Sequence, residues 1–251
     1  CESFEMAKKF TAVITARYAS TRLPGKPLAD INGKTMIQRV YEQAIASEAA
    51  EVIIATDDER ILKVCAQFGA HVELTRTDHE SGTDRIAELA ERFEWPDARI
   101  VVNVQGDEPG LPPALVTQVA AVLEKNSGAE MATLVTPLVS DAEWDDPNVA
   151  KVVTDREGRA LYFSRASIPF PRGGDRPQAS RHVGIYAYRV GALKKLAGTP
   201  PCEIEVIEGL EQLRALWLGL PIAVAGACEK PSRHVETAED LEAVRQELED
   251  R

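Results

Sequence analysis

The chain has 251 residues, of which 44% are hydrophobic, and its 29 Lys and Arg against 40 Asp and Glu give a net charge of −11. This size and apolar content are enough for a substantial core, in one large domain or two small ones. The negative charge argues against nucleic acid or an anionic membrane surface as a partner. No apolar run in the sequence approaches the ~18 residues of a membrane-spanning helix.

The four cysteines show neither a C-x-x-C spacing nor a metal-binding pattern. A chain of this size does not need disulfides for stability, so reduced thiols and a cytoplasmic location are expected. The N-terminal segment CESFEMAKKF lacks the apolar centre of a signal peptide. We expect residues 1–7 to be either residues added for expression or a disordered N-terminus. Residues 8–251 are expected to form one domain.

Short apolar strands alternate with amphipathic helices over the first half of the chain. Apolar positions recur at helical spacing in 34–47, whereas 51–56 is a short β-branched run typical of a buried strand. The predicted strands are 10–15, 51–56, 71–75 and 99–105, and the predicted helices are 34–47, 58–69 and 82–93. This alternation indicates an α/β fold with a mixed, mostly parallel central sheet and helices on both of its faces.

After about residue 125, strand-like segments follow one another at shorter spacing. They are 131–138, 150–155, 160–165 and 182–189, and the turn-rich segment 169–180 precedes the last of them. A helix over 205–219, a strand over 222–227 and a helix over 238–251 are predicted to close the chain. Because there is no long linker, we expect the second half to cover a substrate within the same domain.

The segment ARYASTRLPGKPL, residues 16–28, follows the first predicted strand and holds Arg17, Arg22 and Lys26. Ligands of open α/β sheets bind beyond the carboxyl ends of the strands. Cations and backbone amides at such a place replace the water around phosphate oxygens. The segment matches neither a Walker P-loop nor G-x-G-x-x-G. It therefore predicts a polyphosphate site, with a solvated basic loop as the alternative.

Two further segments follow predicted strands. NVQGDEP places Asp107 where its carboxylate can hold Mg²⁺ near a phosphate, and capping a turn is its alternative role. DHESGTDR opens the helix at 82–93, where Ser81 or Thr83 can cap the helix. The amides of that helix end can bind an anion, and Arg85 adds a cation there.

The second half carries residues suited to a polyhydroxylated acid. An arginine supplies charge for the acid group, and neutral polar side chains bind hydroxyls. The candidates are Arg165, His182, Tyr186, Glu211 and Gln212. Each also has an ordinary structural alternative, such as a core histidine at 182 or a solvated helix face at 211.

Together and in this order, the motifs resemble the 3-deoxy-manno-octulosonate cytidylyltransferase family, the CMP-Kdo synthetases. The resemblance covers roughly residues 8–250 and rests on ARYASTRLPGKPL, ATDDERI, SGTDRIAE, NVQGDEP, MATL, KVV, ALYFSRASIPF, RHVGIYAYR and EGLEQLRAL. It implies a nucleotide-diphospho-sugar transferase fold and transfer of CMP from CTP to 3-deoxy-D-manno-octulosonate (Kdo) for lipopolysaccharide synthesis. It also implies Mg²⁺ as a cofactor and a homodimer.

The resemblance further implies that residues 8–125 bind the nucleotide, and residues 126–251 the sugar acid and the dimer partner. Arg17, Lys26 and Asp107 match catalytic positions, and Asp107 also matches a magnesium ligand. The positions that match nucleotide contacts are Ala16, Arg17, Ser20, Lys26, Ser81, Gly82, Arg85 and Gln105, and those that match acceptor contacts are Arg165, His182, Tyr186, Glu211 and Gln212.

The chain departs from the family pattern near its end. The family reads GVDTPEDL where this chain reads HVETAEDL, so Glu236 stands in place of a metal-binding aspartate and His234 in place of a glycine. We expect Glu236 to be the second Mg²⁺ ligand, with service to the helix N-terminus as its alternative role. Two other functions stay open. One is the same transfer to another acid, such as an amino-Kdo, a sialic-acid-like sugar or a phosphonate, and the other is nucleotide binding without catalysis.

Overall fold

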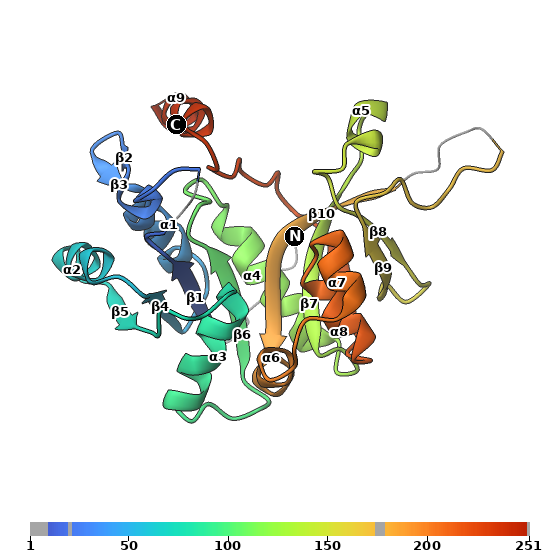
Figure 1. Cartoon of the computed structure of the whole chain (residues 1–251), viewed down its shortest axis with the longest axis horizontal. Coiled ribbons are helices and arrows are strands. Elements are labelled where there is room, and N and C mark those ends of the chain that lie inside the picture. The colour runs from blue at the N-terminus through green and yellow to red at the C-terminus, as the bar shows by residue number, and fades with distance from the viewer. Residues whose placement is uncertain (1–9, 20–21, 174–178, 250–251) are drawn as a thin grey trace.

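The computed structural model describes residues 10–19, 22–173 and 179–249, which form a central sheet covered by helices (Figure 1). The strand order is β11-β7-β10-β6-β1-β4-β5, with β8 and β9 paired beside β10. The strands are β1 (Phe10–Ala16), β4 (Glu51–Thr56), β5 (His71–Leu74), β6 (Ile100–Gln105), β7 (Met131–Pro137), β8 (Lys151–Thr154), β9 (Ala160–Ser164), β10 (Ser180–Arg189) and β11 (Ile222–Gly226), with a separate hairpin of β2 (Asp30–Ile31) and β3 (Lys34–Thr35).

Along this order, every strand except β10 runs in the same direction. β10 is antiparallel to both β6 and β7, whereas the other neighbouring pairs are parallel. The predicted mixed, mostly parallel sheet is therefore confirmed. Because β6 comes from the first half of the chain and β10 from the second, a single sheet carries both the segments expected to bind the nucleotide and those expected to bind the acid.

Helices cover both faces because alternate residues of each buried strand point to opposite sides. The helices are η1 (Lys26–Leu28), α1 (Met36–Ile45), α2 (Glu59–Gln67), α3 (Gly82–Arg92), α4 (Pro113–Lys125), α5 (Asp141–Asp145), α6 (Val190–Ala197), α7 (Glu203–Glu208), α8 (Gln212–Trp217) and α9 (Ala238–Glu249). Ile14 of β1 packs in the apolar cluster of α1, α2 and α4, whereas Val13 packs in the cluster of α3, α6 and α8. Helix α9 packs apart from both clusters, against Ile31 and Met36.

The prediction of one helix over 205–219 is wrong. The chain breaks at Gly209, whose φ of 61° lies in the left-handed region that glycine adopts readily, so α7 and α8 are separate helices. A buried ion pair joins them, in which the Arg214 guanidinium donates to both carboxylate oxygens of Glu205 at 2.9 and 2.7 Å. The sequence analysis also did not identify α4, α5 and α6 as helices.

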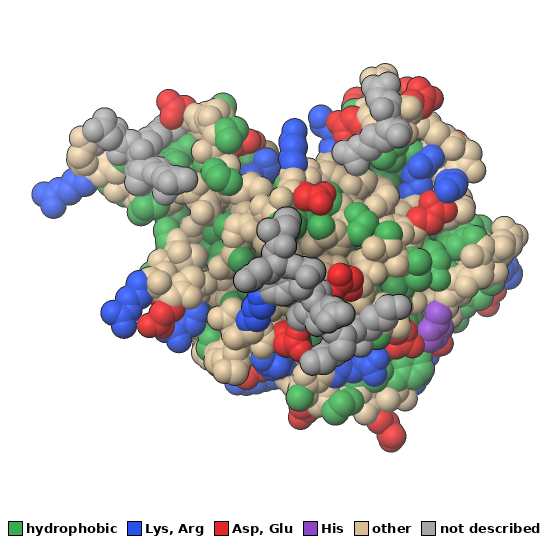
Figure 2. Space-filling view, turned by 180° about the vertical axis from the view of Figure 1, so that it is seen from behind, with side chains coloured by type: hydrophobic (Ala, Val, Ile, Leu, Met, Phe, Trp, Pro, Cys, Tyr) green, Lys and Arg blue, Asp and Glu red, His purple; other side chains and the backbone are tan. Residues whose placement is uncertain are grey.

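The described surface carries charges of both signs. On the face seen in Figure 2, Lys and Arg side chains are interspersed with Asp and Glu rather than gathered into one basic area. None of the helices within the described ranges is long and apolar enough to cross a membrane.

Candidate active site

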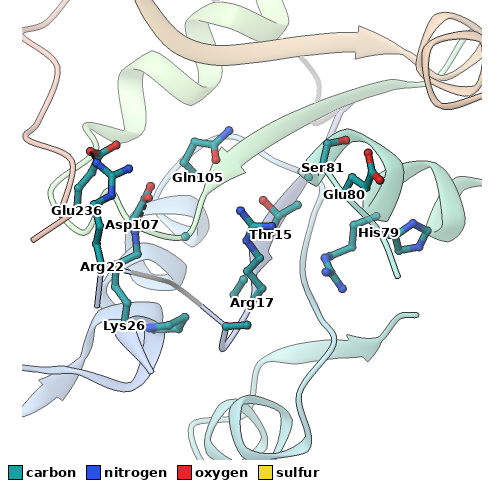
Figure 3. A pocket seen from close by; sticks show the side chains of 16 residues that line it. Thr15, Arg17, Arg22, Lys26, His79, Glu80, Ser81, Gln105, Asp107 and Glu236 are labelled. Atoms are coloured by element: carbon teal, nitrogen blue, oxygen red, sulfur yellow. Dashed lines mark hydrogen bonds and ion pairs between the residues drawn. The ribbon is translucent and has the colours of Figure 1, made fainter. Parts of the chain in front are cut away.

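The loops after β1 and β6 and the N-terminus of α3 surround a cavity of about 460 Å³ (Figure 3). Thr15 pairs with Gln105, so the carboxyl ends of the two parallel strands lie side by side. Gly106 permits this approach, because a Cβ there would lie only 2.5 Å from the Thr15 carbonyl oxygen. The lining residues are Thr15, Ala16, Arg17, Ala19, Arg22, Lys26, Pro27, His79, Glu80, Ser81, Gly82, Arg85, Gln105, Gly106, Asp107 and Glu236.

The basic loop after β1 turns back at Gly25, whose φ is 71°. The Gly25 amide donates to the Tyr18 carbonyl at 3.1 Å, and the Arg60 guanidinium lies 3.3 Å from the centre of the Tyr18 ring. This fold brings Arg17 and Lys26 to the same cavity (Figure 3). Ser20, predicted to contact the nucleotide, lies outside the described residues.

Lys26 connects the loop after β6 to the segment before α9. Its Nζ donates to Asp107 Oδ2 and to the Val235 carbonyl, each at 2.8 Å. Burial disfavours the ionised form of Asp107, but the neighbouring side chains of His234 and Lys26 outweigh it and lower the pKa of Asp107 to about 2. Asp107 is therefore a carboxylate at neutral pH, as a cation ligand must be.

Glu236 enters the same cavity from the segment before α9. Its Oε2 accepts a hydrogen bond from Arg22 Nη1 at 2.5 Å, and the two side chains point toward each other in Figure 3. The start of α9 is held by other residues, because the Asp240 amide donates to Thr237 Oγ1 at 3.2 Å and Asp240 Oδ2 accepts from the Thr237 amide at 3.0 Å. The Glu236 carboxylate is therefore not needed to cap α9, and it lines the cavity.

The donors on this side of the cavity fit Mg²⁺. Asp107 and Glu236 both line it, and Mg²⁺ commonly binds through one or two carboxylates while water and substrate phosphates complete its shell. Within the described part of the chain, no cluster of three or more His, Cys, Asp or Glu side chains could hold a metal. A site completed by a bound triphosphate is therefore the arrangement that these residues suit.

The N-terminus of α3 forms the opposite side of the cavity. Ser81 Oγ accepts from the Asp84 amide and Asp84 Oδ2 accepts from the Ser81 amide, both at 3.1 Å, which makes a capping box. Ser81, rather than Thr83, is therefore the cap. Ser81 and Gly82 line the cavity at the end of the helix that favours a bound anion.

Arg85 lines the cavity, but the fold occupies its donors. Its side chain is buried and donates to Asp57 Oδ2 at 2.8 Å, to the Thr75 hydroxyl and to the Arg76 carbonyl at 3.3 Å. These bonds fix the start of α3 against the segments that follow β4 and β5. Arg85 therefore lies at the cavity where a nucleotide contact was predicted, but its guanidinium is hydrogen-bonded to other parts of the protein.

A second, smaller cavity of about 80 Å³ lies beside the first, and Gln105 lines both. Its lining residues are Thr83, Asn103, Gln105, Met131, Tyr186, Tyr188, Leu196, Glu211 and Gln212. Four buried polar atoms of this lining have no hydrogen-bond partner among the described residues: Asn103 Oδ1, the Tyr186 hydroxyl, Glu211 Oε1 and Gln212 Nε2. Buried polar groups normally have partners, so these atoms suit a ligand rich in hydroxyls.

Two of the predicted acceptor residues, Arg165 and His182, line neither cavity. The Arg165 guanidinium donates to the backbone carbonyls of Pro147, Glu208 and Gly209 at 2.9, 2.7 and 3.4 Å. The His182 ring lies 5.2 Å from the Tyr186 ring, and its burial lowers the pKa of His182 to about 3. The imidazole is therefore neutral and supports the wall that carries Tyr186.

Sequence reasoning did not assign several residues of the larger cavity, among them His79 and Glu80, which precede the cap of α3. His79 Nε2 lies 2.6 Å from Glu88 Oε2, so α3 itself fixes its ring. Both residues stand in the segment DHESGTDR, and their position directly before a helix N-terminus was the available signal.

Known proteins similar to this chain share its length and fold. A family model described as "Cytidylyltransferase" matches residues 11–222. The 3-deoxy-manno-octulosonate cytidylyltransferase of Pseudomonas fluorescens Pf-5 is 53% identical over 97% of this chain and 100% of its own. The enzyme of that name from Vibrio vulnificus CMCP6 is 54% identical over 94% of this chain and 97% of its own.

Solved structures agree with this likeness. A CMP:2-keto-3-deoxy-manno-octonic acid synthetase complexed with CTP superimposes with a TM-score of 0.91, at 42% identity over 96% of this chain and 99% of that one. A cytidylyltransferase from Leptospira borgpetersenii, 18% identical, shares the fold with a TM-score of 0.62 over 97% of this chain and 87% of that one. The resemblance seen in the sequence motifs is confirmed, and the chain belongs to the 3-deoxy-manno-octulosonate cytidylyltransferase family.

Proposed function

We propose that the protein transfers CMP from CTP to Kdo, giving CMP-Kdo and pyrophosphate. The observation that carries this proposal is the pair of cavities that meet at Gln105. The larger one gathers cations and a helix N-terminus, which suit a triphosphate, and the smaller one presents unpartnered polar atoms, which suit a sugar. The names of the relatives support octulosonate as the acceptor rather than another acid.

In the proposed reaction, the anomeric hydroxyl oxygen of Kdo forms a bond to the α-phosphorus of CTP. The bond from that phosphorus to the oxygen bridging to the β-phosphate breaks, pyrophosphate leaves with the electron pair, and the hydroxyl proton passes to water. Arg17 and Lys26 stabilise the negative charge on the phosphates. Glu211 and Gln212 hold the sugar, so that the hydroxyl stands in line with the leaving group.

Asp107 and Glu236 are the residues that would hold Mg²⁺ at this site. Bound there, the ion would neutralise phosphate charge and align the triphosphate. Lys26 and Arg22, which pair with these two carboxylates, would then turn their donors toward phosphate oxygens.

The test is pyrophosphate release, measured with each of the four ribonucleoside triphosphates against a panel of acidic sugars, with Mg²⁺ and with a chelator. We expect CTP with Kdo to be the best pair and the chelator to abolish release. A preference for UTP or ATP, or no CTP-dependent release with any acidic sugar, would overturn the proposal.

We further propose that the protein acts as a homodimer in the cytoplasm and supplies lipopolysaccharide synthesis. Exposed apolar side chains on α7 and α8, namely Val206, Ile207 and Trp217, support a partner surface, and the described cysteines are free thiols, as in a reducing compartment. Light scattering after gel filtration tests the dimer. Ile207→Glu should yield a monomer, and a monomeric wild type would contradict the proposal.

A further inference from the structure

Strand β10 contains a β-bulge beside the smaller cavity. Leu134 of β7 pairs with Val183 of β10. The residue before Leu134, which is Thr133, pairs with Tyr186. The two residues of β10 between these partners, 184–185, pair with neither β6 nor β7. They are extra residues on one strand, which is the definition of a bulge, and β10 curves along this part of its length (Figure 1).

The bulge brings two rings of β10 into contact. Residues four apart in a regular strand have Cα atoms about 13 Å apart. The ring centres of His182 and Tyr186 are nevertheless only 5.2 Å apart. The supported phenol lines the smaller cavity, where the Tyr186 hydroxyl is buried without a partner among the described residues. The place of this hydroxyl therefore depends on the bulge.

Thr133 makes the side-chain contacts that hold the bulge. Its side chain is fully buried, and its Oγ1 lies 2.8 Å from the Ile185 carbonyl oxygen and 3.1 Å from the Val183 carbonyl oxygen. The same Oγ1 lies 3.1 Å from His182 Nε2. Thr133 is the third residue of MATL, one of the motifs that carry the family resemblance. It lines neither cavity.

These contacts fix where the protons lie. A hydroxyl has one proton and carbonyl oxygens only accept, so the Thr133 proton points to the carbonyls of the bulge. Oγ1 can then only accept from His182, whose neutral ring must carry its proton on Nε2. One threonine thus joins the backbone of the bulge to the ring that supports Tyr186.

We propose that Thr133 is a positioning residue for the acceptor sugar: it holds the bulge and the His182 ring so that the Tyr186 hydroxyl can bind a hydroxyl of the sugar. The inference rests on the proposed function and deepens it, because it assigns a role to a residue that does not line the cavity. Loss of one neutral hydrogen bond should raise the KM for the acceptor by about 3- to 10-fold. The KM for CTP should stay close to that of the wild type.

Thr133→Val tests the hydroxyl, because valine keeps the branched shape and loses the polar group. It should raise the acceptor KM, and Thr133→Ser, which keeps a hydroxyl, should restore most of the affinity. Thr11→Val is the matched control. It removes another fully buried hydroxyl, which accepts from the Arg99 guanidinium near the amino end of β1. This control should leave the acceptor KM unchanged.

Tyr186→Phe shows whether Thr133 acts through the Tyr186 hydroxyl. By itself it should raise the acceptor KM by a factor similar to that of Thr133→Val. Combined in one chain, the two substitutions should have little more effect than either alone, since residues that act through one contact are not additive. Two factors that multiply would overturn the proposal, because Thr133 would then act by another route.

The nitrogen chemical shifts of the His182 ring test the contact on the free protein, without any reaction. The wild type should show a proton on Nε2 and none on Nδ1, and Thr133→Val should shift the Nε2 signal. A wild-type ring with its proton on Nδ1 would overturn the proposal, because Nε2 could not then donate to Thr133.

Wild-type pyrophosphate release with CTP and Kdo is measured first. Its absence overturns the proposed function and this inference with it. Normal wild-type turnover with an unchanged acceptor KM in Thr133→Val overturns this inference alone. Melting followed by circular dichroism shows whether each variant is folded. If Thr133→Val does not fold, Thr133→Cys, which keeps a weaker donor, serves for the same comparison.

Discussion

The ammonium of Lys26 lies 2.8 Å from Asp107 Oδ2 and 2.8 Å from the Val235 carbonyl oxygen. One side chain therefore joins the segments that carry two of the cavity's carboxylates, Asp107 and Glu236, because Val235 directly precedes Glu236. The Val235 amide also donates to the Asp107 carbonyl at 2.9 Å. Lys26 thus aligns the side of the cavity that we propose to bind Mg²⁺, in addition to its expected role toward phosphate.

We predict that Lys26→Ala lowers kcat/KM by about 10²-fold or more, the scale seen when one preorganised charge is removed from a transition state. Because Lys26 also holds the Val235 carbonyl, the variant should exchange the Val235 amide hydrogen faster. Hydrogen exchange followed by NMR measures this. Lys34→Ala, which removes an exposed lysine paired with Glu42, is the control and should change neither quantity. Turnover like that of the wild type would remove Lys26 from the catalytic residues.

Glu236→Gln should raise the Mg²⁺ concentration for half-maximal turnover by about 10-fold or more, since it removes a charged ligand. Its melting temperature should hardly change, because Thr237 and Asp240 hold the start of α9. Titrations of turnover with Mg²⁺ and of the free protein with Mn²⁺, followed by electron paramagnetic resonance, check both points. Glu239→Gln on α9 is the matched control. A normal kcat with an unshifted Mg²⁺ curve would exclude Glu236 as a ligand.

Glu205→Ala should destabilise the fold. It removes the carboxylate that accepts two hydrogen bonds from the buried Arg214 guanidinium and leaves only the longer ion pair with Glu211 at 3.5 Å; breaking a buried ion pair typically costs about 3–5 kcal/mol of unfolding free energy. Urea unfolding followed by circular dichroism measures the loss. Glu203→Ala, on the exposed side of α7, should cost far less. Equal losses in the two variants would show that the ion pair does not hold α7 to α8.

His182 should make stability fall in acid. The pKa of His182 is lowered to about 3 in the folded protein from its ordinary 6.5, because burial disfavours the charged ring. Between these two pH values the unfolded chain binds a proton on His182 that the folded chain does not bind. The free energy of unfolding is therefore undiminished above pH 6.5 and falls as the pH is lowered toward 3. His182→Gln should make this decline shallower by up to about 1.4 kcal/mol per pH unit.

Urea unfolding of the wild type and of His182→Gln across this pH range measures the difference. The carbon chemical shifts of the His182 ring give an independent check, since they should stay constant from pH 8 to pH 5. A ring that titrates within that interval would contradict the assignment.

Most of the residues predicted to contact the nucleotide line the larger cavity, and the sequence could group them because its signals are local. Cations and a turning glycine at 16–28 stand directly after an apolar strand, and the geometry of a parallel sheet then places them with Asp107. The sequence does not reveal which charged side chains form ion pairs with each other. Arg85 meets Asp57, which lies 28 residues earlier, and the pairing depends on how α3 packs rather than on any motif.

The misjudged helix over 205–219 has a similar cause. Its apolar spacing continues across Gly209, and a glycine within a helix costs only about 1 kcal/mol, so local preference does not decide whether the chain breaks there. The contact of Arg214 with Glu205 joins the two helices across the break, and it depends on tertiary packing rather than on local preference. Helix α6 was missed because β10 runs directly into it, and Arg189 at the junction forms no side-chain hydrogen bond that caps the helix.

The reversed direction of β10 bears on how acceptor choice can evolve. The loops that line the larger cavity leave the sheet at the carboxyl ends of β1 and β6, whereas β10 enters it there, with Tyr186 opposite Asn103. Because β10 lies between β6 and β7, with Val183 and Ile185 in the apolar core, the wall of the smaller cavity shares its support with the loops of the larger one. Substitutions that change the preferred acceptor must therefore keep these apolar positions and fall on residues that line the smaller cavity, such as Tyr186, Glu211 and Gln212.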